Sequence, residues 1–117
     1  FGNDWPTKDG TCIRDYIHVM DLADAHLASL DYLMNNKAQL ISINIGTGNG
    51  TSVIEIIEKF TNVAKIEIPF KFEERRKGDP ASVVADNSLS LELLNWKPKR
   101  DLSDMCIDAW QWEKNKN

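Results

Sequence analysis

The sequence predicts a small α/β (α+β) domain of short strands with about four helices, formed by residues 1–117 as one unit. Three observations support this fold class. Apolar and polar residues alternate in short runs, as in strands. Longer runs with helical apolar spacing follow residues that can cap a helix, and Gly, Pro, Asn and Asp separate the two kinds of run. The length suffices for one hydrophobic core but not for two.

The first third of the chain is predicted as a loop, a strand and a long helix. Residues 1–12 are rich in turn formers. Residues 16–19 alternate like a short strand, and Asp21 can cap a helix over 22–34. This helix carries two apolar stripes, so we expect it to lie between two layers or to face a part of the protein beyond this chain. His26 is predicted to be a packing or capping residue.

The middle third is predicted as strand, glycine-rich turn and helix. Residues 40–45 give the clearest strand pattern, and Ser52 with Glu55 forms a capping box for a helix over 53–63. The glycines of the turn stand at 46, 48 and 50, one residue short of the GxGxxG spacing of dinucleotide sites. A complete nicotinamide site is therefore not expected here, although the helix N-terminus could face part of a ligand.

The last third is predicted as two strands and two helices. Residues 66–74 alternate around Pro69, as in an edge strand, and 83–85 form a short strand. Asp86 or Ser88 can cap a helix through Leu94. A final helix begins at Asp101 and runs to about residue 114, and it places its two tryptophans on opposite sides, so at least one should reach a neighbouring layer or subunit.

Charge and cysteine content restrict the function classes. The net charge of −4 argues against a nucleic-acid or anionic membrane surface, but one or two local arginines suffice for a nucleotide diphosphate. Cys12 and Cys106 show no metal or redox spacing, and they fit a reducing, cytoplasmic environment. No run approaches the roughly 18 apolar residues of a membrane span. Because the chain begins at Phe1 without a capping or strand signal, we expect a fragment of a longer protein.

Two separated arginine sites suggest a clamp for a dianionic ligand. Arg14 precedes the first predicted strand, and Arg76 lies in a run of three cations after residues 66–74. A guanidinium can grip a phosphate with two parallel hydrogen bonds. The alternatives are a surface pair of Arg14 with Asp15, and a solvated cationic turn. Asp79, just beyond the cations, adds a carboxylate that could accept hydrogen bonds from ribose hydroxyls.

The motifs FGNDWPT at 1–7, RDYIHV at 14–19 and DLA at 21–23 closely resemble the UDP-glucose (UDP-galactose) 4-epimerases, isomerases of galactose metabolism within the extended short-chain dehydrogenase/reductase family. The segments NIGTG at 44–48, RRKGD at 75–79 and LNW at 94–96 follow in the order of that family. The resemblance covers essentially the whole chain. It implies the C-terminal, substrate-binding part of an extended short-chain dehydrogenase fold.

The resemblance also implies roles for individual residues. Arg14 and Arg76 are similar to the arginines that neutralise the UDP diphosphate, and Asp79 to a carboxylate near the ribose. Phe1 matches the aromatic residue beside the uridine. The other implied site residues are Val53 as an apolar wall, Tyr16 as a site-lining residue and Val83 near the sugar. Because valine is modest in volume, we expect some tolerance for N-acetylated sugars.

The family's catalytic Tyr-x-x-x-Lys pair and glycine-rich NAD site are missing from this sequence. The resemblance therefore implies that NAD binds to a missing N-terminal Rossmann domain, that the full-length enzyme is a cytoplasmic homodimer, and that this chain alone has no activity. No catalytic, cofactor or metal residue is expected on the chain. The alternatives are a 4,6-dehydratase or decarboxylase of the same superfamily, and a nucleotide-sugar binding module without chemistry.

Overall fold

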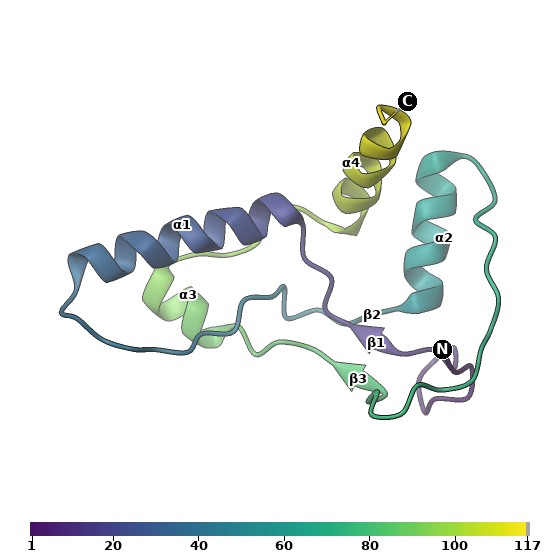
Figure 1. The fold of residues 1–117 in the computed structure, drawn as a ribbon, viewed down its shortest axis with the longest axis horizontal. Helices are drawn as coiled ribbons and strands as arrows, with labels where there is room; N and C mark the ends of the chain where they lie inside the picture. The colour runs from purple at the N-terminus through teal and green to yellow at the C-terminus, as the bar shows by residue number, and fades with distance from the viewer. Residues whose placement is uncertain (117) are drawn as a thin grey trace.

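A computed structural model describes residues 1–116, in which a small mixed sheet joins two helical arms (Figure 1). The central strand β1 (Ile13–Arg14) pairs antiparallel with β2 (Thr51–Ser52) and parallel with β3 (Ser82–Val83). Ile13 lies opposite Ser52 on one side and Ser82 on the other. The sheet therefore gathers three loops that are remote in sequence.

Four helices of the described residues form the arms, in agreement with the predicted fold class. They are α1 (Val19–Asn35), α2 (Val53–Ala64), α3 (Ser88–Leu94) and α4 (Leu102–Lys114). Helix α2 packs on α4, and α1 packs on α3 (Figure 1). Phe60 of α2 meets Trp110 of α4 edge to face, with ring centroids 6.2 Å apart. Trp110 thus reaches a neighbouring helix, as predicted for at least one of the two tryptophans, whereas Trp112 is 69% exposed.

The molecule is open, and its buried core is small. The radius of gyration is 16.9 Å, whereas a compact domain of this length would have about 13 Å. The buried apolar residues among those described are Cys12, Ala25, Trp96 and Cys106. Much of the apolar surface of the helices consequently faces outward. None of the helices in residues 1–116 combines the length and apolarity that crossing a bilayer requires.

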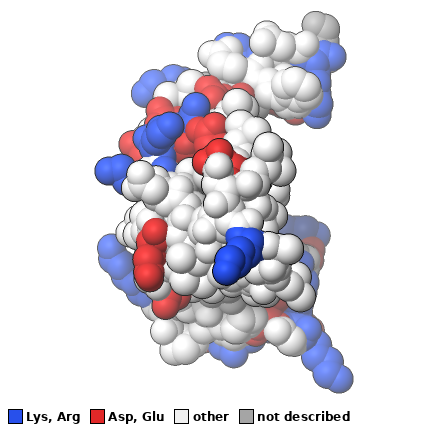
Figure 2. Space-filling model, turned by 90° about the vertical axis from the view of Figure 1, so that its left-hand side faces the viewer, with Lys and Arg blue, Asp and Glu red and all other residues white. Residues whose placement is uncertain are grey.

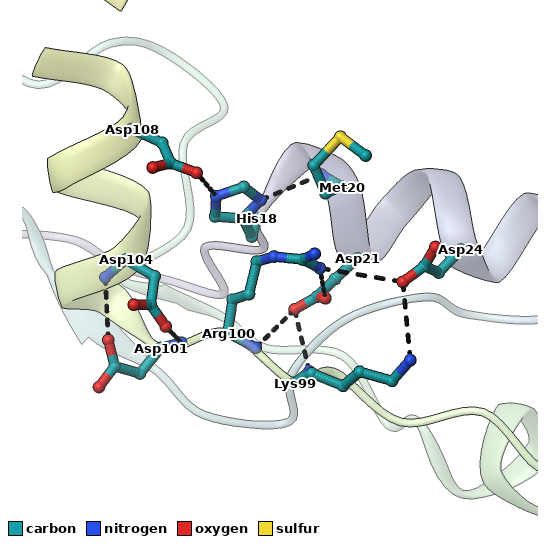
Figure 3. Close-up of polar contacts among 9 residues, drawn as sticks. All are labelled: His18, Met20, Asp21, Asp24, Lys99, Arg100, Asp101, Asp104 and Asp108. Atoms are coloured by element: carbon teal, nitrogen blue, oxygen red, sulfur yellow. Dashed lines mark hydrogen bonds and ion pairs between the residues drawn. The ribbon is translucent and has the colours of Figure 1, made fainter. Parts of the chain in front are cut away.

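A polar network joins the start of α1 to the segment that leads into α4 (Figure 3). The buried carboxylate of Asp21 accepts hydrogen bonds from the backbone N–H of Lys99 at 3.0 Å and of Arg100 at 2.9 Å. It also pairs with the Arg100 guanidinium at 2.5 Å. Burial alone would raise the pKa of Asp21, but these three donors outweigh it and hold the pKa below its ordinary value. The carboxylate therefore stays ionised and ties the two segments together.

Helix α1 begins three residues earlier than the sequence indicates, and residues 16–19 are not a strand. His18 is the N-cap, and its Nδ1 accepts the N–H of Met20 at 3.0 Å while its Nε2 donates to Asp108 of α4 at 3.0 Å (Figure 3). Asp21 lies in the first turn and does not cap the helix. Residues 16–19 alternate in polarity, but within residues 1–116 they pair with no strand. The strand in this part of the chain is residues 13–14.

Two further predicted strands are wrong. Residues 40–45 and 66–74 form no strand, since neither run meets a neighbouring strand within residues 1–116. The strand expected at 83–85 is β3 at 82–83 instead. A periodic pattern records which face of a segment is apolar, but a strand also needs a partner for its backbone groups.

The predicted capping box at α2 is confirmed, and the structure adds a second one at α4, whose predicted start at Asp101 is also confirmed. Ser52 Oγ accepts the N–H of Glu55 at 3.1 Å, and the Glu55 carboxylate accepts the N–H of Ser52 at 2.8 Å. Asp101 and Asp104 form the same reciprocal pair at α4. Helix α3 has Asn87 as its N-cap without a side-chain bond, so neither predicted residue caps it.

Candidate functional site

The sheet places Arg14 directly against the loop that carries Arg76 and Asp79. Arg14 lies opposite Val83 in the parallel β1–β3 pair. Its Nη1 donates to the carbonyl of Pro80 at 3.0 Å and to that of Ile13 at 2.7 Å. The guanidinium is thus fixed against the loop that precedes β3 rather than paired with Asp15, which was the alternative interpretation.

Arg76 and Asp79 form a turn beside Phe1. Arg76 Nε donates to the Asp79 carboxylate at 2.9 Å, and the Asp79 N–H donates to the Arg76 carbonyl at 3.2 Å. The guanidinium carbon of Arg76 lies 4.7 Å from the centre of the Phe1 ring. Because Arg14 binds Pro80 and Arg76 binds Asp79, the two guanidinium groups contact adjacent residues. The two predicted arginine sites therefore meet the same short stretch of chain, residues 79–80.

Arg75 and Trp5 hold the N-terminal loop against this turn, a role that the sequence analysis missed. Arg75 stacks on Trp5 at 4.0 Å and donates from Nε to Asp4 at 2.7 Å. The N–H of Gly2 donates to the Glu73 carbonyl at 2.7 Å. Gly2 has a φ of +77°, and a Cβ there would overlap the Trp5 indole and the Arg75 side chain. The available signal was the presence of aromatic residues in one loop and of a cationic run in the other.

Phe1 and Val53 share a small apolar cleft of about 130 Å³, and Arg76 lies over the ring of Phe1. Its walls also include Phe70 and Phe72, whose rings meet edge to face at 5.5 Å. The extended run 66–74, expected as a strand, thus supplies an aromatic wall instead. A flat, uncharged ring could enter such a cleft while a charged group stays at the guanidinium groups.

Val83 and Tyr16 lie at the margins of the cluster. Val83 is 49% exposed beside Arg14. Tyr16 faces a different groove, of about 780 Å³, between the start of α1 and the helices α2 and α4. Burial raises the pKa of the Tyr16 phenol, and the positive charge of Arg14 opposes that rise in part. Phe1 and Val53 thus share the apolar cleft, Arg76 lies over Phe1 and binds Asp79, Arg14 binds the adjacent Pro80, and Tyr16 lies apart from the cleft.

The glycine-rich turn is held by a side chain of the protein itself. The Asp15 carboxylate accepts the N–H of Thr47 and of Gly48, each at 2.9 Å, and the N–H of Ala85 at 3.2 Å. Burial raises the pKa of Asp15, but these bonds and the Thr47 hydroxyl lower it overall. Because its amides already bind a carboxylate, the turn does not fit a dinucleotide phosphate.

The backbone amides at the N-terminus of α2 are equally occupied by groups of the chain itself. Its amides at 52–55 bind the Glu55 carboxylate, the Cys12 carbonyl, the Thr11 hydroxyl and the Ser52 hydroxyl. Residues 1–116 contain no group of three or more acidic, His or Cys side chains that could hold a metal ion. The arginines and the apolar cleft remain the best candidate binding site.

Comparison with known proteins agrees with the sequence resemblance. The family model of GDP-mannose 4,6 dehydratase matches residues 1–109. A curated UDP-glucose 4-epimerase of Bacillus subtilis is 46% identical over 113 residues, which are 97% of this chain and 33% of that protein. The chain spans about a third of the length of the curated relatives that it matches.

Solved structures give the same result. A UDP-glucose 4-epimerase from Stenotrophomonas maltophila, with bound NAD and formylated UDP-arabinopyranose, is 47% identical, with a TM-score of 0.93 over 98% of this chain and 34% of that chain. The enzyme from Bifidobacterium longum, in complex with NAD+ and UDP, is 39% identical, with a TM-score of 0.93 over 99% of this chain and 34% of that chain. The match of a family model to nearly the whole sequence shows that this chain belongs to the GDP-mannose 4,6 dehydratase family, and within it the chain is similar to the UDP-glucose 4-epimerases.

Proposed function

We propose that this chain is the UDP-sugar-binding part of a UDP-glucose 4-epimerase, which interconverts UDP-galactose and UDP-glucose. The observation that carries the proposal is the attachment of Arg14 and Arg76 to adjacent residues beside an apolar cleft. The relatives with known structures bind UDP or a UDP-sugar together with NAD. A nucleotide diphosphate combines the two chemistries that this surface offers, namely an anion and a flat ring.

In this proposal the uracil enters the cleft between Phe1 and Val53, and the diphosphate lies on the two guanidinium groups. Asp79 accepts hydrogen bonds from ribose hydroxyls while its other oxygen keeps Arg76 in place. The sugar then extends toward Val83 at the sheet edge, and Tyr16 lines the site on the side of the larger groove. Binding energy from the nucleotide, which does not react, positions the sugar for the chemistry.

NAD supplies hydride transfer at sugar C4 in the proposed reaction, and we assign its binding to the part of the enzyme outside these residues. The glycine-rich turn of this chain is closed by Asp15, and neither Tyr16 nor Tyr32 is followed by Lys at the fourth position. The residues present can thus hold and orient the nucleotide but offer no proton acceptor of the required pattern. The isolated chain should therefore bind UDP weakly and show no epimerase activity. We place the full-length enzyme in the cytoplasm as a homodimer.

Calorimetric titration with UDP tests the proposal. Arg14→Ala and Arg76→Ala should each weaken binding by about 1.5–3 kcal/mol, roughly 10- to 150-fold. Lys77→Ala is the matched control, because it removes a neighbouring cation that has no recorded hydrogen bond within residues 1–116. Equal loss in all three variants would reduce the clamp to general electrostatics and contradict the proposal.

A second candidate is a 4,6-dehydratase or decarboxylase of the same superfamily, which the description of the matching family model favours. A non-catalytic binding module is the third. Titration with GDP beside UDP separates guanine from uracil recognition. Assays of the full-length protein with UDP-galactose then distinguish epimerisation from loss of water or carbon dioxide and from the absence of turnover.

A further inference from the structure

Arg75 and Arg76 are neighbours in the chain, and each lies over an aromatic ring of the N-terminal loop. The guanidinium carbon of Arg75 is 4.0 Å from the centre of the Trp5 ring, and that of Arg76 is 4.7 Å from the centre of the Phe1 ring. A guanidinium is attracted to the face of an aromatic ring. The segment that leads from α2 to β3 thereby contacts the N-terminal loop at two points (Figure 1).

The two arginines use their hydrogen-bond donors differently. Arg75 donates from Nε to the Asp4 carboxylate at 2.7 Å and from Nη2 to the Asp4 carbonyl at 2.5 Å, so its planar fork binds the loop. Arg76 donates from Nε to Asp79, and within residues 1–116 its Nη1 and Nη2 make no hydrogen bond. The Arg76 side chain is also the more exposed, at 60% against 41% for Arg75. Arg76 is therefore available to an anion, whereas Arg75 is bound to the protein.

The contacts of Arg75 reach Phe1 through the residues beside it. The Trp5 indole, on which Arg75 stacks, donates to the Phe1 carbonyl at 3.2 Å. The N–H of Gly2 donates at 2.7 Å to the carbonyl of Glu73, two residues before Arg75. A Cβ on Gly2 would lie only 2.8 Å from Cγ of Arg75, so the two segments are in close contact. The backbone that follows the Phe1 ring is thus fixed by groups that Arg75 holds in place.

The Phe1 ring needs this support because Phe1 is 54% exposed. The ring has no polar atom of its own, and it borders both the apolar cleft and the Arg76 guanidinium. Since packing covers only part of the ring, the backbone beside it sets where the ring lies. A side chain that is ordered before a ligand arrives loses less conformational freedom on binding. Fixing Phe1 in advance therefore favours the binding of a flat base.

We propose that Arg75 is a positioning residue for the nucleotide. By holding Trp5 and Asp4, it keeps the Phe1 ring between the cleft and the Arg76 guanidinium before the ligand arrives, and it does not touch the ligand itself. The inference rests on the proposed binding of UDP. It adds a residue that sets the affinity for the base without contacting the base.

The positive charge of Arg75 is the competing explanation for any effect on UDP binding. Residues 75–77 are three cations in a row, whereas the end of the molecule where α1 ends is mostly uncharged (Figure 2). A cation at position 75 could attract a diphosphate without any contact to the loop. Arg75→Lys separates the two explanations, because an ammonium group keeps the charge but lacks the planar fork that stacks on Trp5 and binds Asp4.

Calorimetric titration of the full-length protein with UDP tests the inference. Arg75→Ala, Arg75→Lys and Trp5→Ala should each weaken UDP binding by about 10-fold, as expected for residues coupled to a binding group. Lys77→Ala removes the same charge two residues away and should change the affinity by less than about 2-fold. In a Phe1→Ala background, Arg75→Ala should add less than about 2-fold, because the ring that it positions is gone.

Hydrogen exchange without ligand measures the positioning itself. The amides of Gly2 and Trp5 bind the carbonyls of Glu73 and Gly10. Arg75→Ala should speed the exchange of these two amides by about 10-fold or more, because the loop then opens more easily. Lys77→Ala is again the matched control and should leave their exchange unchanged.

Three results would overturn the inference. The first is UDP binding by Arg75→Lys as tight as that of the unmodified protein, which would assign the effect to charge. The second is an effect of Arg75→Ala that is equally large in the Phe1→Ala background, and the third is equal amide exchange in Arg75→Ala and Lys77→Ala. If Arg75→Ala binds UDP as the unmodified protein does while Arg14→Ala binds weakly, the inference fails and the proposed function stands. Absence of UDP binding by the unmodified protein removes both.

Discussion

At the scale of single residues, the apolar core is small, and a few polar side chains hold remote segments together by hydrogen bonds. Asp15 binds three amides from two remote segments, and Asp21 binds two amides and a guanidinium. Each carboxylate fixes loops that no strand or helix holds. Since both are acceptors with lowered pKa values, their contribution depends on their charge.

Replacing Asp21 by Asn should destabilise the chain by about 3 kcal/mol, because the Arg100 guanidinium then loses its buried partner. Asp24→Asn is the control, since its carboxylate lies 3.8 Å from Arg100 and 3.9 Å from Lys99 and is partly exposed. The control should cost at most about 1 kcal/mol. Urea unfolding measures both values, and similar costs for the two variants would contradict the assigned role of Asp21.

The same pair of variants predicts a pH dependence. The pKa of Asp21 is lower in the folded chain than its ordinary value of 3.8, so the unfolded chain binds more protons just below that pH. Stability from Asp21 is present above pH 3.8 and is lost as the pH falls through the folded pKa. Asp21→Asn should therefore lose less stability on acidification below pH 4 than Asp24→Asn does, as followed by circular dichroism. An identical acid profile would refute this.

Val83 should set the size of sugar that the full-length enzyme accepts. It is a modest side chain that lies exposed beside Arg14, so an acetamido group could fit there. We expect turnover of both UDP-galactose and UDP-N-acetylgalactosamine, and Val83→Tyr should reduce use of the acetylated sugar more than that of the other. Val83→Ile is the matched control. No detectable use of UDP-N-acetylgalactosamine by the unmodified enzyme would disprove the expectation.

At the scale of elements, the start of a helix is specified by nearby residues, but the capping residues differ in burial and in their other hydrogen bonds. Ser52 caps α2 and also donates to Asp9, and it is 4% exposed. Asp101 caps α4 at an exposed site. A cap that also joins two segments should contribute more stability than one that serves its own helix alone.

Ser52→Ala should cost about 2 kcal/mol and Asp101→Ala about 1 kcal/mol. The difference arises because the first variant also removes the part-buried hydrogen bond from Ser52 to Asp9. Chemical denaturation of the two variants measures the costs. A larger loss in Asp101→Ala would show that the link from Ser52 to Asp9 adds nothing.

At the scale of the whole molecule, apolar surface is unusually accessible. Helix α1 exposes Leu27, Leu30 and Met34, the second of the two stripes seen in the sequence. A separate apolar groove of about 780 Å³ lies between the start of α1 and the α2–α4 arm. Large contiguous apolar patches are rare on monomers.

The isolated chain should therefore self-associate at high concentration, as measured by light scattering. Leu27→Lys combined with Leu30→Lys should reduce the association. Asn62→Lys combined with Gln111→Lys adds the same two charges at exposed polar positions and should have a smaller effect. A monomer at every concentration would count against this expectation.

The sequence by itself determined the features whose causes are local. The capping box of α2 and the start of α4 at Asp101 follow from residues a few positions apart. Family likeness supplied the site residues. The arginine-bearing loops could be named because guanidinium chemistry depends on residue type.

Only the tertiary structure decided which extended segments pair with a neighbouring strand. Residues 16–19, 40–45 and 66–74 all alternate, yet the strands formed at 13–14, 51–52 and 82–83, where remote segments meet. His18 reached Asp108 and Asp15 closed the glycine-rich turn, because atoms far away in sequence were brought within hydrogen-bond distance. Alternation and spacing are properties of one segment, whereas pairing, burial and convergence on a ligand depend on two or more.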